Sequence, residues 1–420
     1  MGCKGTRIIF QNGVGKKTYY NQTCPNSSKS EKLGGSPAHD MPERIFIDSR
    51  EEQNLREQLN AKTDPESSRM KRYLTMPDLS RTPGSPIHEV AQRILVLEDF
   101  KDFADVQVPE IVPADKSFDL FDFPVDHPSR SKSDTYYVDD GNILRTHTTI
   151  SWYYYLMSEH AKEKIKKNES LGVLTYGKVY RKDEIDRHHM NIFHQMDGYY
   201  LIPKDQGIIT IDDLKEALVK IAQAVFGPHI QYRFNEDAFP YTNPSLEMEI
   251  EKNGKWLEIL GCGVVKGSVL EKLGVDSHNY TGWAFGIGLE RLAIISMELP
   301  DIRLFWSDDK RVKRQLKLDN PYKEVSKFPP ITRDISFIVG NNFVPNNYFD
   351  LIRDIGGDLV EEVKLLDKYQ NAEKFGPDKT SYTYRIVYRS NERTLTTEEI
   401  DPLQAKIYSQ TAELFGAELR

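Results

Sequence analysis

A glycine-rich segment ending in an arginine limits most strongly what this chain can fold into. Residues 281–292 read Thr-Gly-Trp-Ala-Phe-Gly-Ile-Gly-Leu-Glu-Arg-Leu. Glycine lets the backbone approach a ligand where a Cβ atom would collide. An aliphatic run follows with Arg291 near its start, and a guanidinium offers a planar fork of donors to phosphate oxygens. The segment predicts either a phosphate site or a plain turn into a helix.

The size and charge of the chain narrow the class of protein. Its 420 residues have room for two or three domains, and its hydrophobic and charged fractions of 39% and 29% are ordinary for a globular protein. No apolar run approaches the roughly 20 residues of a membrane span, so no membrane partner is expected. Because the net charge of the chain is −8, a bound nucleic acid would have to contact local basic patches such as residues 310–314. That run is equally typical of a solvated helix face.

The cysteines and the first residues bear on the compartment. Cys3, Cys24 and Cys262 form neither a disulfide framework nor a zinc pattern, which favours a reducing compartment. Residues 1–45 are expected to be a flexible arm, because the first 40 are rich in Gly, Ser, Asn and Lys and poor in acids. This composition also fits the remnant of an import segment, and residues 1–6 match an N-myristoylation pattern with Cys3 available for palmitoylation.

Helical and strand patterns alternate in the first three quarters of the chain. Helices are expected over about 48–74 and 87–103, the second after Ser85 as N-cap and Pro86 at its first position. Mostly strands are expected over 106–303, including a hairpin of 246–250 and 255–260 around Asn253-Gly254. One helix inside this block begins with a capping box at Thr210–Asp213 and stops at Gly227-Pro228.

The last part of the chain has a pattern of its own after residues 327–330. Strands are predicted at 334–339, 360–369 and 381–389, and helices at 346–355 and 397–414, with a possible short final strand. This β-α-β-β-α-β order is the ferredoxin-like plan, which is usually a separate module.

Two predicted strands place an amide and a carboxylate together. Residues 177–184 and 192–198 would form an antiparallel hairpin, and side-chain alternation puts Gln195 and Asp197 on one face. Both groups can accept hydrogen bonds from a ligand amino group. The alternative is a solvated hairpin. His188 and His189 in its loop lack Cys or His partners at metal-ligand spacing.

Two further segments are candidates for a binding pocket. Residues 144–152 gather hydroxyls and His147 before a helix-like run at 152–161, either to bind a ligand or to cap the helix. Phe239 and Tyr241 flank a proline and are either ordinary core or the wall of a pocket for a flat apolar ligand. Glu258 stands close to Gly261 and Gly263, where a carboxylate meets two positions without Cβ atoms.

These segments together resemble the phenylalanyl-tRNA synthetases, a family of class II aminoacyl-tRNA synthetases. Gly-Lys-Val-Tyr-Arg at 177–181 with Phe-His-Gln at 193–195 is similar to class II motif 2, and Gly-Ile-Gly-Leu-Glu-Arg at 286–291 to motif 3. Further matching segments are Asp-His-Pro-Ser-Arg at 126–130, Arg-Thr-His-Thr at 145–148, Phe-Pro-Tyr at 239–241, Leu-Gly-Cys-Gly at 260–263 and Gly-Trp-Ala-Phe at 282–285. The resemblance covers about residues 85–420 and has the layout of the single-chain mitochondrial enzymes.

The resemblance implies a fold and a domain order. The fold is α+β, with a class II catalytic domain built on an antiparallel sheet and a C-terminal ferredoxin-like anticodon-binding domain. The implied division is an arm at 1–45, the catalytic domain at 46–310, a linker at 311–326 and the anticodon-binding domain at 327–420.

The resemblance also implies a role for each matching residue. Arg181 would bind the α-phosphate of ATP and Arg291 the γ-phosphate, Phe239 and Tyr241 would wall the phenyl ring, and Phe285 would stack on adenine. Glu258 would orient Mg²⁺ or a ribose. The amino group of phenylalanine would meet His147, Thr149, Gln195 and Asp197. The remaining residues implied at the substrate site are Ile150, Ser151, Trp152, His188, His189, Met190, Met196, Gly261 and Gly263.

The implied activity is that of a phenylalanine–tRNA ligase, with ATP as a substrate and Mg²⁺ as its companion. Phenylalanine and tRNA(Phe) are the expected partners, the chain is expected to be a monomer, and the expected location is the mitochondrial matrix, with another organelle or the cytoplasm as alternatives. Two other classes stay open: a catalytically silent RNA-binding relative, and a class II-like ligase that acts on a small molecule without RNA.

Three residues depart from the pattern of the family. Asp197 stands where many members have Glu, Thr149 replaces the usual Ser, and Tyr241 replaces the usual Phe. Tyr241 brings a hydroxyl to an apolar wall, and an apolar pocket excludes an extra hydroxyl only modestly. The rejection of tyrosine therefore depends on the surroundings of Tyr241.

Overall fold

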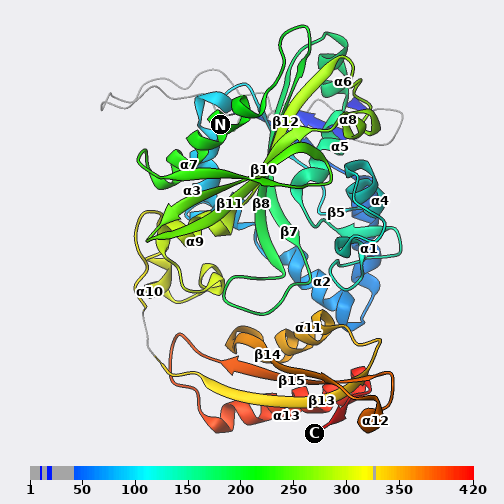
Figure 1. Cartoon of the computed structure of the whole chain (residues 1–420), viewed down its shortest axis with the longest axis vertical. Helices are drawn as coiled ribbons and strands as arrows, with labels where there is room; N and C mark the ends of the chain where they lie inside the picture. Colours follow the sequence, from blue (N-terminus) through cyan, green and yellow to red (C-terminus); the bar gives the residue numbers. More distant parts are fainter. Residues whose placement is uncertain (1–9, 12–16, 21–41, 325–327) are drawn as a thin grey trace, which may run out of the picture. The chain divides into compact units, whose positions relative to one another are not determined.

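The computed structural model describes residues 10–11, 17–20, 42–324 and 328–420, which form two compact units (Figure 1). The first unit combines Met1–Arg130, Tyr137–Val179 and Phe193–Ser296, and the second combines Ser131–Tyr136, Tyr180–Ile192 and Met297–Arg420. Most of the predicted N-terminal arm, with Cys3 and Cys24, lies outside the described residues. No helix among the described residues has the length and apolarity that crossing a bilayer requires.

A large sheet organises the first unit. Within the described residues it has ten strands, in the spatial order β1 (Phe10–Gln11), β2 (Lys17–Tyr20), β3 (Glu43–Ile47), β4 (Ala104–Gln107), β7 (Leu171–Tyr180), β8 (Ile192–Pro203), β12 (Tyr280–Gly288), β11 (Lys255–Val265), β10 (Thr242–Lys252) and β9 (Tyr232–Asp237). The pairs β3/β4 and β4/β7 are parallel, and β8, β12, β11, β10 and β9 pair antiparallel in that order. A small second sheet pairs β5 (Ile111–Pro113) with β6 (Asn142–Leu144).

Strand β3 corrects the predicted end of the N-terminal arm. Residues 43–45 were expected in that arm, but they begin β3. Ile45 and Ile47 are 1% and 3% exposed, whereas Phe46 between them and Arg44 before them are exposed. This alternation buries one face of the strand, so the segment belongs to the sheet.

Helices cover both faces of the large sheet. The helices of this unit are α1 (Arg50–Ala61), α2 (Pro65–Thr75), α3 (Pro86–Leu95), α4 (Ala114–Phe118), α5 (Ser151–Leu156), α6 (Glu159–Lys166), α7 (Ile211–Phe226), α8 (Gly267–Lys272) and α9 (Leu289–Met297). One core packs residues of α4, α5 and α8 against β7, β8 and β12. Helix α7 lies against β11, β12 and α3, and Figure 1 draws α3 and α7 on the other side of the strands from α4 and α5.

The sequence signals for the ends of two helices are confirmed. Ser85 caps α3 by accepting the N–H of Ile87, with Pro86 at the first position. Thr210 and Asp213 form a reciprocal capping box at the start of α7, and Gly227, with φ of +93°, ends that helix. These are local interactions between residues a few positions apart, so they are visible in the sequence.

Three predicted helices have other bounds. The stretch 48–74 is two helices, because Asp64 caps α2 by accepting the N–H of Ser67 and Pro65 begins it. The helix predicted at 87–103 ends at Leu95 and is followed by a short 3-10 turn, Glu98–Phe100. The run 152–161 is broken between α5 and α6, where Ser158 accepts the N–H of Ala161 as a new N-cap.

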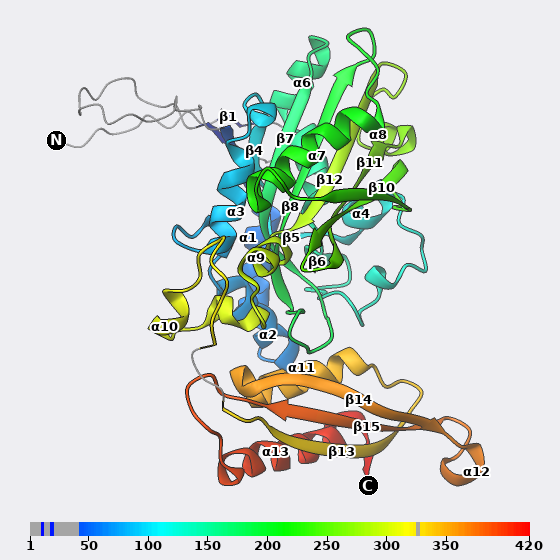
Figure 2. The ribbon, with the colours of Figure 1, turned by 60° about the vertical axis from the view of Figure 1, so that its left-hand side comes forward.

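The C-terminal part of the second unit has the predicted ferredoxin-like plan. Its order is β13 (Ile331–Gly340), α11 (Pro345–Gly356), β14 (Val360–Gln370), β15 (Lys379–Tyr388), α13 (Thr397–Phe415) and β16 (Glu418–Leu419). The strands lie in the order β14-β15-β13-β16 with antiparallel pairs, and both helices contribute to one core with the strands. Short helices α10 (Lys310–Lys313) and α12 (Ala372–Phe375) complete the unit, and Figure 2 shows α12 at the far end of the β14–β15 hairpin.

Candidate active site

Two glycines and an aspartate form one row across three strands of the large sheet. Gly261 on β11 lies opposite Gly286 on β12, and Gly286 lies opposite Asp197 on β8. A Cβ atom on Gly286 would lie 2.8 Å from Oδ1 of Asp197 and 3.2 Å from Nε2 of Gln195. A Cβ atom on Gly261 would lie 2.5 Å from Cζ of Phe239. The two glycines therefore leave the space in which these side chains, and a ligand beside them, can lie.

The polar end of this row carries a buried carboxylate. Asp197 is 3% exposed, and its Oδ2 accepts a hydrogen bond from Thr149 Oγ1 at 2.7 Å. Gln195 Nε2 lies 3.4 Å from Oδ1 of Asp197, so the two side chains share a face as predicted. Oε1 of Gln195 is buried without a hydrogen-bond partner among the described residues. A buried acceptor beside a carboxylate suits a cation with several N–H groups.

The other end of the row has aromatic walls. Phe239 and Tyr241 have nearly parallel rings, with an interplanar angle of 18° and centroids 6.2 Å apart. Trp152 meets Tyr241 edge to face at 6.2 Å, and Phe123 stacks on Tyr241 at the same distance. Such pairs orient aromatic rings, and their exposed edges and faces favour contact with a further flat apolar group.

A cavity of about 240 Å³ joins the two ends. This volume counts all the empty space between the lining residues, including the part that is open to solvent. The residues that line it are Thr149, Trp152, Asp197, Phe239, Tyr241, Thr242, Gly261, Cys262, Ala284, Phe285 and Gly286.

The segment before α5 contributes only part of what was predicted. Thr149 and Trp152 line the cavity, but Ile150 and Ser151 are completely buried in the core. His147 is stacked on Phe123 at 5.8 Å and is not one of the lining residues. The 3-10 turn Thr148–Ile150 lets only some of its consecutive side chains face the cavity, which explains the difference.

Side-chain alternation corrects two other predictions. Phe285 is among the residues that border the cavity, but it stands between Ala284 and Gly286, so its ring points to the opposite face of β12. There it is 3% exposed, lies over Gly198 and packs against Phe100 and Trp283, which leaves no face open for adenine. Met196, between Gln195 and Asp197, is likewise fully buried on that opposite face.

Arg291 and Glu258 form an ion pair at the edge of this site. The carboxylate Oε2 of Glu258 lies 3.1 Å from Nη1 of Arg291, and both side chains are half exposed. The register between β10 and β11 shifts so that Ile259 is an extra residue between Leu260 and Glu258. A bulge of this kind redirects the next side chain, which brings Glu258 towards Arg291 at the start of α9. Gly263, also on β11, packs closely against β10, because a Cβ atom at this position would collide with the carbonyl of Pro244.

The loop between β7 and β8 belongs to the second unit. Arg181 directly follows β7 with an exposed side chain, and its backbone N–H donates to the carbonyl of Asn191 at 3.0 Å. His188 and His189 are exposed and Met190 is half-buried. None of these loop residues lines the cavity described above, so their predicted roles rest on the resemblance alone.

An aspartate organises this loop. Oδ1 of Asp186 accepts the backbone N–H groups of His188 and His189, and its Oδ2 lies 2.8 Å from Nδ1 of His189. Burial acts to raise the pKa of Asp186, but the hydrogen bonds from the His189 ring and the His188 N–H outweigh it and lower the pKa to about 2. The contact with Asp186 in turn raises the pKa of His189. Asp186 therefore organises the turn through the backbone of both histidines and the ring of His189.

Several residues of the site were missed by sequence reasoning. Thr242, Cys262, Ala284 and Gly286 line the cavity without having been assigned a role. Gly286 belongs to the glycine-rich segment 281–292, but its place opposite Asp197 depends on the register of β12 against β8. Cys262 pairs with Phe285, so its side chain lies on the same face of the sheet as the Phe285 ring, where burial raises the pKa of the thiol to about 12.

The described residues contain no group of three or more His, Cys, Asp or Glu side chains that could hold a metal ion. Magnesium usually binds proteins through one or two carboxylates together with substrate phosphates, and so it needs no such group. Glu258 remains the candidate carboxylate.

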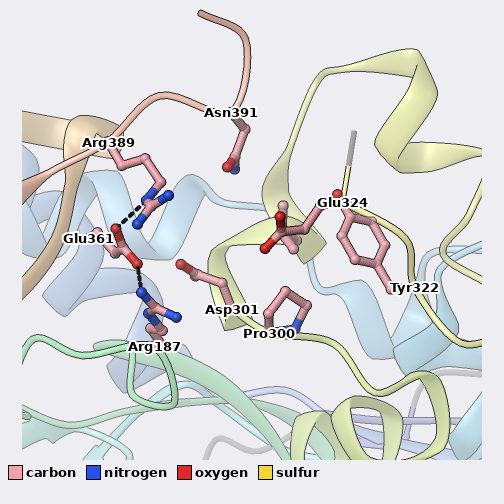
Figure 3. A pocket seen from close by; sticks show the side chains of 9 residues that line it. Arg187, Pro300, Asp301, Tyr322, Glu324, Glu361, Arg389 and Asn391 are labelled. Carbon is pink, nitrogen blue, oxygen red and sulfur yellow. Dashed lines mark hydrogen bonds and ion pairs between the residues drawn. The ribbon is translucent and has the colours of Figure 1, made fainter. Parts of the chain in front are cut away.

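A larger cavity of about 490 Å³ lies in the second unit (Figure 3). Glu361 lies at one side of it, between Arg187 and Arg389, and forms ion pairs with both. Asp301 on its rim is paired with Arg303 at 2.6 Å. Since arginines already neutralise these carboxylates, their charges do not call for a bound cation, and we assign the ion pairs a structural role in this unit.

Family comparisons agree with the arrangement of the site and of the C-terminal part. Residues 74–316 match the model of the class II core domain (F) of tRNA synthetases, and residues 326–420 match that of the ferredoxin-fold anticodon-binding domain. The class II match covers more than half of the chain.

Curated relatives match over most of their length. The chloroplastic/mitochondrial phenylalanine–tRNA ligase of Arabidopsis thaliana is 42% identical over 332 residues, which cover 76% of this chain and 73% of the relative. The mitochondrial phenylalanine–tRNA ligase of Mus musculus is 35% identical, with 75% and 74% covered. That of Saccharomyces cerevisiae is 33% identical, with 74% and 81% covered. This chain therefore belongs to the phenylalanyl-tRNA synthetase family of class II aminoacyl-tRNA synthetases.

Proposed function

We propose that this chain is a phenylalanine–tRNA ligase that first makes phenylalanyl-adenylate and then charges tRNA(Phe). The observation that carries this proposal is the row of Gly261, Gly286 and Asp197, with aromatic walls at one end and a buried carboxylate at the other. The arrangement is complementary to phenylalanine, which has a flat apolar side chain and, a short distance away, a positively charged ammonium group.

The ammonium group of phenylalanine would bind at the polar end. Asp197 supplies the countercharge, and Oε1 of Gln195 supplies a further acceptor. Thr149 donates to Asp197 and thereby fixes the carboxylate. A buried ion pair is favourable only when the remaining hydrogen-bonding groups are satisfied, and these neighbours meet that condition.

ATP would bind beside the ion pair of Glu258 and Arg291. Arg291 is half exposed, so its guanidinium can exchange the Glu258 carboxylate for the γ-phosphate. Arg181 would bind the α-phosphate, a role that rests on the resemblance to motif 2. Phe193 is half-buried and shares the face of Gln195 and Asp197 by alternation, so it replaces Phe285 as the ring proposed to stack on adenine.

Magnesium would be held by Glu258 together with the phosphates of ATP, because a half-exposed carboxylate beside a phosphate-binding arginine suits this ion. The ion would supply charge neutralisation on the phosphate oxygens. The chain's own residues orient the substrates.

The reaction follows from these positions. A carboxylate oxygen of phenylalanine attacks the α-phosphorus of ATP, the new O–P bond forms, and pyrophosphate leaves. A hydroxyl of the terminal ribose of tRNA then attacks the carbonyl carbon, and AMP leaves. Positioning and stabilisation of the developing negative charge by Arg181 and Arg291 provide most of the rate.

The other parts of the proposal concern domains, partners and location. The family matches support a catalytic domain at 46–310 and an anticodon-binding domain at 327–420. Residues 311–326 would link the two. A monomer is proposed from the fused layout. The names of the relatives in mouse and yeast support a mitochondrial location, and we place the enzyme in the matrix.

Phenylalanine-dependent exchange of pyrophosphate into ATP tests the proposal. We expect exchange that requires phenylalanine, followed by charging of tRNA(Phe) with purified full-length protein. The absence of exchange from well-folded protein would identify a catalytically silent relative. Exchange without transfer to any tRNA would identify a ligase that acts on a small molecule.

Tyr241 provides a test of selectivity. The hydroxyl of Tyr241 stands in an aromatic wall and can hydrogen-bond the hydroxyl of a bound tyrosine. We expect Tyr241→Phe to raise the ratio of kcat/KM for phenylalanine over tyrosine by about 3- to 10-fold, since one neutral hydrogen bond contributes about 0.5–1.5 kcal/mol. Exchange kinetics with both amino acids measure this ratio. Tyr232→Phe, an exposed change on β9, is the matched control, and an unchanged or lower ratio would contradict this role.

A further inference from the structure

Glu290, directly before Arg291, is almost completely buried and binds His194 twice. It is 4% exposed, and His194 is 0% exposed. Oε2 of Glu290 accepts the backbone N–H of His194 at 2.8 Å, and Oε1 lies 2.6 Å from the ring Nδ1. Neither residue lines the cavity for the amino acid. The contact thus joins the start of α9 to the middle of β8.

The other side of the His194 ring is also fixed. Nε2 accepts the backbone N–H of Leu79 at 2.9 Å, from the 3-10 turn Leu79–Arg81. Because Leu79 donates to Nε2, the ring proton is on Nδ1, where it donates to Glu290. Oδ1 of Asp78 lies 3.5 Å from Nε2, but it accepts the N–H and the hydroxyl of Ser80. His194 is therefore held between two fixed hydrogen-bond partners, one on each ring nitrogen.

We infer that Glu290 and His194 are positioning residues that set the place of Arg291 relative to Gln195 and Asp197. The inference rests on the proposed role of Arg291 in binding ATP. Arg291 follows Glu290 on the first turn of α9, so fixing Glu290 fixes the point from which the arginine side chain extends. Gln195 follows His194 on β8 and is already held by the pairing of β8 with β12, so the contact sets the arginine relative to an amino acid site that the sheet fixes.

The chemistry of the pair argues for more than packing. Burying a carboxylate costs free energy that two hydrogen bonds only partly offset, and an apolar pair of similar size would pack as well. What an apolar pair would not provide is the bidentate contact, which restricts both rotation and sliding of α9 along β8. The contact therefore fixes the ATP site at the start of α9 relative to the amino acid site on β8.

Two substitutions of His194 separate this role from a packing role. In His194→Asn the side-chain amide N–H₂ lies where Nδ1 was and can still donate to Glu290, but the acceptor for Leu79 is lost. In His194→Gln an oxygen reaches the place of Nε2 and can accept from Leu79, but the donor to Glu290 is lost. Each variant removes one of the two ring hydrogen bonds, so a packing role predicts similar effects from both.

The experiment is pyrophosphate exchange with the full chain, with KM for ATP and for phenylalanine measured separately and unfolding temperatures recorded. We expect His194→Gln to raise KM for ATP about tenfold or more, as loss of a charge-assisted hydrogen bond predicts, with KM for phenylalanine nearly unchanged. His194→Asn should restore most of the ATP affinity. Equal KM values for ATP in the two variants would overturn the inference.

A second set of variants covers failure to fold and failure of the proposed function. Glu290→Gln keeps the volume but turns an amide N–H₂ towards a donor of His194, so it should raise KM for ATP in the same way. The double variant with His194→Gln should have a KM for ATP close to that of either single variant, because both substitutions remove the same contact. Additive increases in KM for ATP would contradict the inference. Arg291→Ala in the same assay is the reference. If Arg291→Ala leaves KM for ATP unchanged, the proposed role of Arg291 fails. If Arg291→Ala raises KM for ATP but Glu290→Gln does not, only the positioning role is overturned.

Discussion

Replacing Asp197 with asparagine is expected to lower kcat/KM for phenylalanine by a factor of about 30 or more. Asparagine keeps the acceptor for Thr149 and the size of the side chain, but it removes the negative charge beside the ammonium group. Breaking a buried, hydrogen-bonded charge pair costs about 2–5 kcal/mol, which corresponds to this factor or more. Pyrophosphate exchange at varied phenylalanine concentration measures it.

Asp197→Glu is the matched control for this prediction. It keeps the charge and introduces the residue that many members of the family have, so it should retain most of the activity. KM for ATP should change little in either variant, because Asp197 lies at the amino acid end of the cavity. A loss of less than threefold in Asp197→Asn, in protein with an unchanged unfolding temperature, would refute the role of Asp197 in binding the ammonium group.

Replacing Arg181 with alanine is expected to reduce pyrophosphate exchange by a factor of about 100–1,000 or more. Loss of one preorganised donor to a developing negative charge has effects of this size, mainly in kcat. The fold should tolerate the change, since the side chain is exposed and the backbone stays bound to Asn191. Initial rates of exchange at saturating phenylalanine and ATP measure the loss.

Arg187 offers a control in the same loop. Its guanidinium pairs with Glu361, and so Arg187→Ala removes an equal charge without touching the proposed phosphate site. We expect exchange by Arg187→Ala to stay within a few-fold of the unmodified protein. If Arg181→Ala behaves like Arg187→Ala, the α-phosphate is bound by another group.

The parts of the fold that were correctly predicted depend on local signals. The C-terminal strands and helices were placed within a few residues, because each has a simple period and a turn or cap at its ends. The helix predicted at 48–74 was wrong because its charged residues continue on both sides of the break. Asp64-Pro65, an N-cap followed by proline, marks that break in the sequence.

The site was predictable up to the point where pairing between distant strands decides it. Alternation within β8 alone placed Gln195 and Asp197 on one face. The position of Phe285 depends on the register of β12 against β8, and that of Glu258 on the extra residue Ile259 in β11. Neither the register nor the bulge has a sequence signal, because both result from the packing of the whole sheet.

The floor of the cavity, made by Gly261 and Gly286, limits how the substrate range of this enzyme can evolve. No amino acid is smaller than glycine, so every substitution at these two positions removes space, and mutation there can only exclude ligands. Larger substrates can be admitted only by shortening the walls, such as Phe239 or Tyr241. Selection for a broader substrate range should therefore yield changes in the aromatic walls while both floor positions stay constant.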